Sequence, residues 1–218
     1  MTAEPFAGLT IREFLDRLSS PEPVPGGGSA SAVAASFAAG LIAMVARLSL
    51  DRPKYAAYES THRRVLAFAE HAASQFLDLA DQDADAYAAL AAALKLPRDT
   101  DMQRAERTEA IRGAARRAAD VPLEVVRQCL GLEVEVEALA GRSNLNASSD
   151  VKVAALLAEA AGRGAAANVL VNLPAAVDET FAGDAADEVT RLLSSLEDLA
   201  ARARERGGAG RLRDPESV

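Results

Sequence analysis

The chain has 218 residues, a net charge of −8 and one cysteine, which suits a single globular domain with a sizeable core. The negative charge argues against a nucleic-acid backbone as partner, and the lone cysteine excludes an intramolecular disulfide framework. Half of the residues are hydrophobic, aromatics make up only 4%, and alanine is abundant. Because alanine favours helices, and because no strand pattern or internal repeat appears, we expect an all-α protein.

The first half of the chain predicts three helices. Residues 10–13 (Thr-Ile-Arg-Glu) have the pattern of a capping box, which predicts a short helix ending near Leu18. An uncharged, alanine-rich segment predicts a buried helix from Ser29 to Leu50. Its length nominally suffices for a membrane span, but its serines and many alanines favour a soluble core helix. Pro53 suits the first turn of a long third helix, expected over residues 54–94.

The second half predicts further helices and a tail. The apolar periodicity indicates a helix over residues 101–119, and Pro122 restarts the pattern in a separate helix that ends near Ala140. Two more helices are expected over residues 150–173 and 179–206. We expect residues 1–206 to form one domain, a bundle of long antiparallel helices, and residues 207–218 to form a flexible tail. The N-terminus has no basic patch or apolar signal core, which predicts a cytoplasmic protein without a membrane partner.

A proline-flanked triple glycine opens directly into the alanine-rich helix: Pro23-Val24-Pro25-Gly26-Gly27-Gly28-Ser29. Glycines allow a backbone to approach a ligand closely, and the N–H groups that begin a helix can hold an anionic or polar group. Local physics favours a ligand cradle and a flexible hinge about equally. The segment lacks the Gly-Lys-Ser/Thr of a phosphate loop and follows no strand, which excludes a P-loop and a dinucleotide fingerprint.

One carboxylate lies on a face where it is not expected. A helical wheel of the longest predicted helix places Asp83 at the centre of an apolar stripe, whereas Asp81 and Asp85 point away. Burial raises the pKa of a carboxyl group, which suits a general acid or base; the alternative is a structural Asp bonded to a facing helix. No metal site is expected, because His62 and His71 lie on opposite faces and no Cys/His cluster exists.

Four other polar residues lie at positions that suit either a ligand contact or a structural role. Arg107 shares an otherwise apolar face and could bind a carboxylate or extend to solvent. Asn168 and Asn172 continue a face of alanines one turn apart, and they are either ligand contacts or hydrogen bonds between helices. Asp150 begins a predicted helix, where its charge complements the helix dipole.

Several short blocks occur in a fixed order between about Thr10 and Leu173. They are residues 23–29, 44–49, 83–87, 96–97, 107–110, 121–123, 144–150 and 168–173. In this order and spacing they resemble the cyclodeaminase/cyclohydrolase family, the family of the C-terminal domain of formiminotransferase-cyclodeaminase. The chain departs from the family pattern at Ser49, where Thr is frequent, and before Asn144, where a Gly is common.

The resemblance implies an all-helical bundle, a homodimer, and a tetrahydrofolate derivative as substrate, with no metal and no cofactor beyond that substrate. It implies conversion of 5-formiminotetrahydrofolate to 5,10-methenyltetrahydrofolate and ammonia by acid/base catalysis. The alternatives are a methenyltetrahydrofolate cyclohydrolase that gives 10-formyltetrahydrofolate, and a non-catalytic folate-binding or dimerising helical protein. The family's catalytic aspartate maps onto Asp83. The implied substrate-binding residues are Pro25, Gly26, Gly27, Gly28, Ser29, Lys95, Arg107, Asp150, Asn168 and Asn172.

Overall fold

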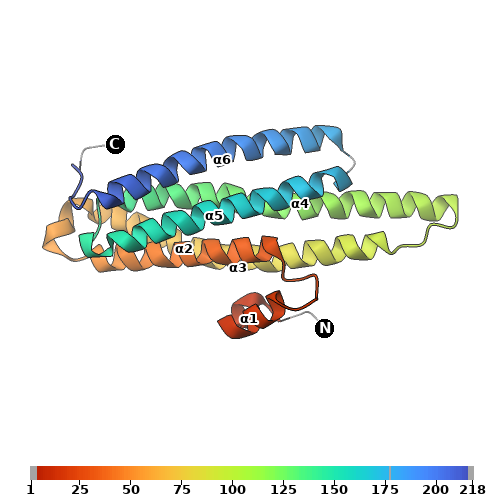
Figure 1. The fold of residues 1–218 in the computed structure, drawn as a ribbon, viewed down its shortest axis with the longest axis horizontal. Helices are drawn as coiled ribbons and strands as arrows, with labels where there is room; N and C mark the ends of the chain where they lie inside the picture. Colours follow the sequence, from red (N-terminus) through yellow and green to blue (C-terminus); the bar gives the residue numbers. More distant parts are fainter. Residues whose placement is uncertain (1–3, 177, 216–218) are drawn as a thin grey trace.

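The computed structural model describes residues 4–176 and 178–215, and these are almost all helical (Figure 1). The α-helices are α1 (Ile11–Leu18), α2 (Gly27–Ser49), α3 (Glu59–Leu94), α4 (Asp101–Leu139), α5 (Ser148–Asn172) and α6 (Glu179–Gly208). Short 3-10 turns connect or extend them: η1 (Phe6–Gly8), η2 (Pro53–Tyr58), η3 (Leu145–Ala147) and η4 (Leu173–Ala176). No β-strand occurs in the described ranges, and the predicted all-α fold is confirmed.

Four long helices form the centre of the molecule. α2 packs on α3 and α5, α4 packs on the same two helices from the other side, and α6 covers α4 and α5 (Figure 1). Alanines such as Ala35 and Ala39 on α2 and Ala158 on α5 are completely buried. Because these side chains are small, the helix backbones approach closely, and few large residues such as Phe76 are needed to fill the core.

The helix α1 lies outside this bundle (Figure 1). Its predicted capping box is confirmed: Thr10 Oγ1 accepts from the Glu13 backbone N–H at 3.2 Å, and Glu13 Oε2 accepts from the Thr10 N–H at 2.7 Å. α1 buries none of its residues fully. An apolar cavity of about 330 Å³ separates it from α2, and the edge-to-face pair of Phe6 and Phe14 lines this cavity. α1 is therefore an accessory to the bundle.

The helix α4 corrects one prediction. The expected break before Pro122 is wrong, because α4 runs without interruption from Asp101 to Leu139. Pro122 has no N–H, so the helical hydrogen bond to the carbonyl of Ala118 cannot form. Asn172 Nδ2 on α5 donates to this carbonyl instead, at 2.8 Å. Pro122 and its neighbours Val121 and Leu123 are buried against other helices, and this packing holds the helix together.

The C-terminal segment also differs from expectation. α6 continues to Gly208, two residues beyond its predicted end. The Arg213 backbone N–H donates to the Gly141 carbonyl at 2.8 Å, its guanidinium pairs with Glu137 at 3.0 Å, and the Tyr58 hydroxyl donates to the Arg213 carbonyl. The described part of the expected tail is therefore fastened to the bundle, whereas residues 216–218 lie outside the described residues.

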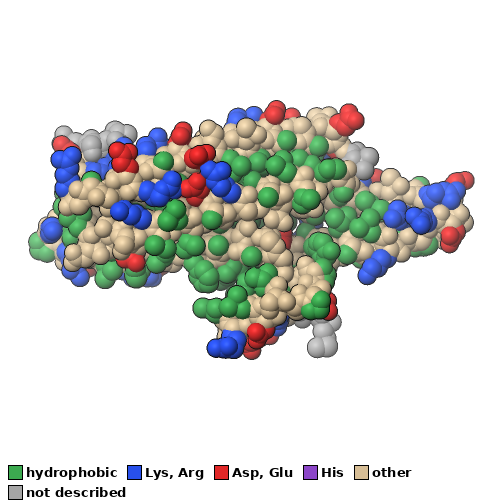
Figure 2. Space-filling model, viewed as in Figure 1, with side chains coloured by type: hydrophobic (Ala, Val, Ile, Leu, Met, Phe, Trp, Pro, Cys, Tyr) green, Lys and Arg blue, Asp and Glu red, His purple; other side chains and the backbone are tan. Residues whose placement is uncertain are grey.

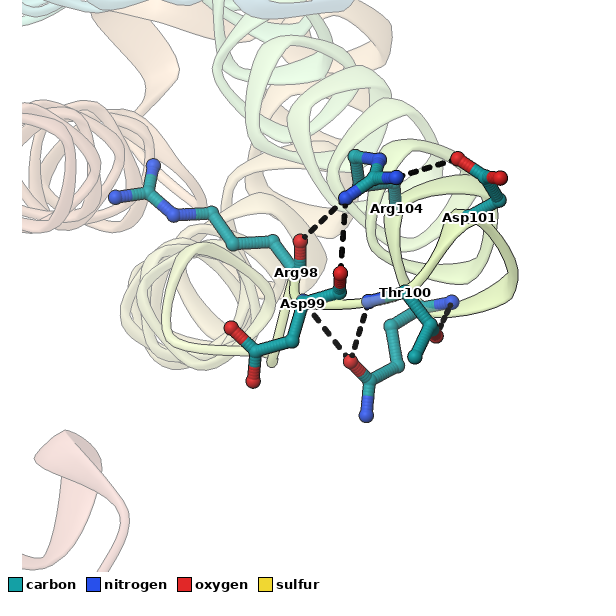
Figure 3. A network of polar contacts seen from close by, with 6 residues as sticks. Arg98, Asp99, Thr100, Asp101 and Arg104 are labelled. Carbon is teal, nitrogen blue, oxygen red and sulfur yellow. Dashed lines mark hydrogen bonds and ion pairs between the residues drawn. The ribbon is translucent and has the colours of Figure 1, made fainter.

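A tight turn joins α3 to α4 and is held by polar contacts (Figure 3). Gln103 Oε1 accepts from the backbone N–H groups of Asp99 and Thr100 at 2.9 and 3.1 Å, and Arg104 donates to the carbonyls of Arg98 and Asp99, each at 3.1 Å. The side chain of Arg98 points away from this network. The two helix ends form a hairpin that projects beyond the other helices and carries many charged side chains (Figures 1 and 2).

Two helical segments of the described chain, Gly27–Ser49 and Leu145–Ala176, are long and apolar enough to cross a membrane by length and composition. They pack against each other in the bundle, which buries 56% and 44% of their most apolar windows. Much of their apolar character therefore serves the core. The remainder faces outward, where Phe37 on α2 and Leu156 on α5 are about half exposed.

Candidate functional site

A cavity of about 210 Å³ lies where the first turn of α2 meets α3 and the C-terminal end of α5. Four segments meet there: the glycine loop, α3, α4 and α5. The lining residues are Pro23, Val24, Gly26, Gly27, Gly28, Asp83, Tyr87, Ala118, Asn168, Val171 and Asn172. The cavity therefore gathers the glycine loop, the aspartate on the apolar stripe and the two asparagines that the sequence singled out.

Asp83 is held by the first turn of α2. The Ser29 hydroxyl is completely buried and donates to Asp83 Oδ2 at 2.9 Å. The same Ser29 Oγ lies 3.1 Å from the carbonyl oxygen of Ala80. A hydroxyl has one proton to donate and two lone pairs to accept with. When Asp83 is ionised, Ser29 donates to it. When Asp83 is protonated, it can donate to Ser29, which then donates to Ala80. The site thus satisfies both charge states of Asp83 without rearranging heavy atoms.

The surroundings also change the acidity of Asp83. Burial raises the pKa of this carboxyl group above its ordinary value of 3.8, and hydrogen bonds from the Ser29 side chain and backbone oppose that rise. Burial is the larger effect because no Lys or Arg in the described part of the chain forms an ion pair with Asp83. A carboxyl group whose pKa is raised in this way can exchange protons nearer to neutral pH.

The glycine loop approaches Asp83 so closely that one of its glycines is sterically required. A Cβ atom at Gly28 would lie 2.2 Å from Asp83 Oδ1, whereas a Cβ at Gly27 would lie 3.5 Å from Asn168 Nδ2, an ordinary contact. Gly26 is the N-cap residue of α2, and Pro25 is buried behind it after a cis peptide bond. The sequence left open whether this loop is a ligand cradle or a flexible hinge, and its position beside the cavity supports the ligand cradle.

The two asparagines project from the last turns of α5. Asn168 Nδ2 donates to the Gly164 carbonyl of its own helix at 2.9 Å, and Asn172 Nδ2 donates across to the Ala118 carbonyl of α4 at 2.8 Å. The sequence left open whether they bond to helices or face a ligand. The structure shows that each forms a backbone hydrogen bond and also lines the cavity.

Three of the predicted binding residues lie elsewhere. Lys95 caps the C-terminus of α3, twelve residues and about 18 Å along the helix from Asp83. Arg107 is in the same projecting hairpin and donates to the Leu94 carbonyl at 3.1 Å. Asp150 begins α5, about 33 Å along that helix from Asn172. Within one chain, the structure does not bring these three side chains to the cavity.

Sequence reasoning missed some of the lining. Tyr87 lines the cavity one helical turn after Asp83, and this i+4 spacing was the available signal. Ala118 also lines the cavity and accepts the hydrogen bond of Asn172, and the only signal for this was Pro122 four residues later. In the described residues, no group of three or more His, Cys, Asp or Glu side chains could hold a metal ion.

Comparisons with known proteins place the chain in a family. The family model described as "Formiminotransferase-cyclodeaminase" matches residues 10–191. A methenyltetrahydrofolate cyclohydrolase of Methylorubrum extorquens is 37% identical over 185 residues, which cover 85% of this chain and 89% of the relative. A formimidoyltransferase-cyclodeaminase of Rattus norvegicus is 34% identical over 192 residues, covering 88% of this chain but only 36% of the relative, so the chain spans about a third of that protein.

The fold leads to the same family. The crystal structure of formiminotetrahydrofolate cyclodeaminase from Thermotoga maritima matches with a TM-score of 0.83 at 30% sequence identity, covering 92% of this chain and 96% of that one. The sequence blocks between residues 23 and 173 fall within the range that the family model matches, residues 10–191. The chain therefore belongs to the formiminotransferase-cyclodeaminase family, as its sequence blocks predicted.

Proposed function

We propose that the protein is a folate one-carbon enzyme that converts 5-formiminotetrahydrofolate to 5,10-methenyltetrahydrofolate and ammonia. The observation that carries this proposal is Asp83, a half-buried carboxyl group that lines a cavity and whose hydrogen-bond partners can accommodate both of its charge states. These relatives support the substrate class, because their names refer to a formimino, formimidoyl or methenyl unit.

The proposed reaction needs one proton to move between two nitrogens on the same carbon. The terminal nitrogen of the formimino group is protonated, and N10 attacks the formimino carbon. The electron pair of the C=N bond moves to the terminal nitrogen, which gives a tetrahedral carbon between N5 and N10. Asp83 takes the proton from N10 and returns it to the amino group. The C–N bond to that group then breaks, ammonia leaves, and the N5 lone pair forms the methenyl bridge. A carboxyl group with a raised pKa is suited to both transfers.

The size of the cavity limits what enters it. About 210 Å³ is less than the roughly 300–1,000 Å³ of a typical small-ligand site, so we propose that the cavity holds only the one-carbon unit and part of the pterin ring. The rest of the folate then lies outside, on the side of the projecting hairpin. We retain Lys95 and Arg107 of that hairpin as proposed contacts for the glutamate carboxylates. Asp150 is not carried into the site, because it lies at the opposite end of α5.

The test of the role of Asp83 is Asp83→Asn, which keeps the shape of the side chain and removes its ability to shuttle a proton. The matched control is Asp85→Asn, an exposed position two residues along the same helix. We expect Asp83→Asn to bind the folate normally but to lose at least a hundredfold in kcat, and Asp85→Asn to keep its activity. Full turnover by Asp83→Asn would contradict the proposal.

A second candidate is methenyltetrahydrofolate cyclohydrolase. It is favoured by the relative from Methylorubrum extorquens, which this chain matches over nearly its whole length. In that reaction Asp83 takes one proton from the water that attacks the methenyl carbon and delivers it to N5. The C–N5 bond then breaks, the hydroxyl oxygen forms the formyl C=O as its remaining proton is released to solvent, and 10-formyltetrahydrofolate is left. The chemistry again needs one carboxyl group that acts first as base and then as acid.

Ultraviolet absorbance of the methenyl bridge separates these candidates. The cyclodeaminase makes the absorbance rise when 5-formiminotetrahydrofolate is added, and the cyclohydrolase makes added methenyltetrahydrofolate decay faster than in buffer alone. A folded sample that does neither would support the remaining alternative, a non-catalytic protein that binds folate or only dimerises.

We also propose that the protein is a homodimer. Neighbouring helices α2 and α5 present outward apolar side chains, among them Phe37, Met44, Val153 and Leu156, and hydrophobic side chains are gathered over α5 and along α2 in Figure 2. A continuous apolar face of this kind suits a second copy of the same face. Sedimentation should give a dimer for the wild type and a monomer for Phe37→Glu with unchanged helical circular dichroism. A wild-type monomer at micromolar concentration would contradict this proposal.

A further inference from the structure

The carbonyl of Ala118 is in an unusual position within a helix. In α4 it should accept a hydrogen bond from the N–H of residue 122, four positions later. That residue is Pro122, which has no N–H, and α4 nevertheless continues through it. The Ala118 carbonyl is therefore left without its helical partner at the point where Ala118 lines the cavity.

The partner that replaces it comes from another helix. Asn172 Nδ2 at the end of α5 donates to the Ala118 oxygen at 2.8 Å, and the Asn172 side chain has no other hydrogen-bond partner in the described chain. Because a carbonyl oxygen can only accept, the amide nitrogen of Asn172 must face it. The orientation of the amide is thereby fixed, and its oxygen Oδ1 is left for whatever enters the cavity, which Asn172 lines.

Asn168, one helical turn before Asn172 on α5, forms a different kind of hydrogen bond. Its Nδ2 donates to the Gly164 carbonyl, four residues earlier in the same helix. That contact is local to α5 and needs nothing from α4. Only Asn172 is tied to the opposite wall of the cavity, and only because Pro122 leaves a carbonyl free there.

We propose that Pro122 is a positioning residue for the substrate. By freeing the Ala118 carbonyl it holds the Asn172 amide in one orientation, so that Oδ1 accepts a hydrogen bond from an N–H group of the bound folate. The role of Asn172 in binding substrate rests on the proposed function, since a folate derivative supplies the N–H group. The contacts among Pro122, Ala118 and Asn172 are independent of that function and can be tested without any substrate.

The first experiment is a double-mutant cycle on stability with Pro122→Ala and Asn172→Ala, measured by urea unfolding. In the wild type, Asn172→Ala should raise the unfolding equilibrium constant about fivefold, the value of one net hydrogen bond. After Pro122→Ala, the new N–H serves the Ala118 carbonyl, and Asn172→Ala should change this constant by less than twofold. Pro97→Ala, at an exposed position in the α3–α4 turn, is the control, and the fivefold cost should persist in it. A fivefold cost in all three backgrounds would overturn the proposal.

The second experiment measures kcat and KM with 5-formiminotetrahydrofolate, or with methenyltetrahydrofolate if that is the substrate turned over. Pro122→Ala should make the protein more stable, because proline is unfavourable within a helix, yet should raise KM about fivefold with kcat within twofold. Asn172→Ala should raise KM similarly, and the double variant no further. A stabilised Pro122→Ala with an unchanged KM, or effects that multiply, would overturn the role in substrate binding. A wild type without turnover refutes the proposed function alone, and the stability cycle still decides whether Pro122 positions Asn172.

Discussion

Glu133 gives the protein a pH dependence of stability whose size can be worked out from the structure. Its side chain is completely buried on α4, and neither carboxylate oxygen has a hydrogen-bond partner in the described residues. Burial raises the pKa of this carboxyl group from 4.5 to about 8; the nearby charge of Glu159 adds to the rise, and Arg204 opposes it. Glu133 is therefore largely protonated in the folded protein at neutral pH, whereas in the unfolded chain it is ionised.

The sign follows from proton binding. Between pH 4.5 and about 8 the folded state binds a proton that the unfolded state has released, so stability falls as pH rises. The full contribution is present below pH 4.5 and is lost as the pH approaches 8. At up to about 1.4 kcal/mol per pH unit, the free energy of unfolding should fall by about 3–4 kcal/mol between pH 5 and 8 from this residue alone. A typical domain has only about 5–15 kcal/mol in total, so this change is easily measured.

The variant that isolates this effect is Glu133→Gln, which has nearly the same shape and cannot ionise. Urea unfolding at four pH values from 5 to 8 should show a wild-type free energy that falls about 3–4 kcal/mol more than that of the variant. Glu106→Gln, at an exposed position on the same helix, should keep the wild-type slope. Comparing slopes cancels the other buried acids, Asp83 and Glu135, because they are present in every protein compared. Parallel profiles for wild type and Glu133→Gln would refute the reasoning.

Three further predictions concern the glycine loop and the backbone. Gly28→Ala should lower kcat about a hundredfold with the fold intact, because its Cβ would lie 2.2 Å from Asp83 Oδ1 and would displace the carboxylate; unchanged kinetics would contradict this. Ser29→Ala removes a hydrogen bond that lowers the pKa of Asp83, so the carboxyl pKa in the kcat–pH profile should move to higher pH, and a shift downward would disprove the assignment. Gly141→Ala, at φ +72°, should cost about 1–2 kcal/mol of stability in urea unfolding, whereas Gly113→Ala in open helical surface should gain about 0.5–1 kcal/mol.

The sequence predicted those features that local chemistry determines. The capping box at Thr10 and Glu13 gave the first helix its observed bounds, since the box satisfies the free N–H groups at that helix end. The wheel around Asp83 identified a carboxylate that faces the interior, because helical periodicity alone determines which side chains share a face. Both features depend on residues at most a few helical turns apart.

Other features depend on where a residue lies along a helix relative to its neighbours. Lys95, Arg107 and Asp150 are charged residues that could bind polar groups of a folate. Helical periodicity predicts which face of a helix a residue occupies, but not how far along the helix it lies from the cavity. The structure places these three residues about 12 to 27 Å along their helices from the nearest residue that lines the cavity. The sequence likewise predicts a flexible tail around Arg213, because its partners Gly141 and Glu137 are some seventy residues away in the chain.

Pro122 shows how the same chemistry can be read correctly and still give a wrong prediction. A proline within a helix removes one hydrogen bond, and from the sequence the simplest outcome is that the helix ends. Whether it ends depends on whether the freed carbonyl finds another donor, and Asn172 supplies that donor from fifty residues further along the chain. Asn172 also lines the cavity, so the hydrogen bond that α4 loses at Pro122 is replaced by one that holds the Asn172 amide in a single orientation there. A proline in the interior of a helix next to a pocket is therefore a reason to search the facing helix for an amide side chain.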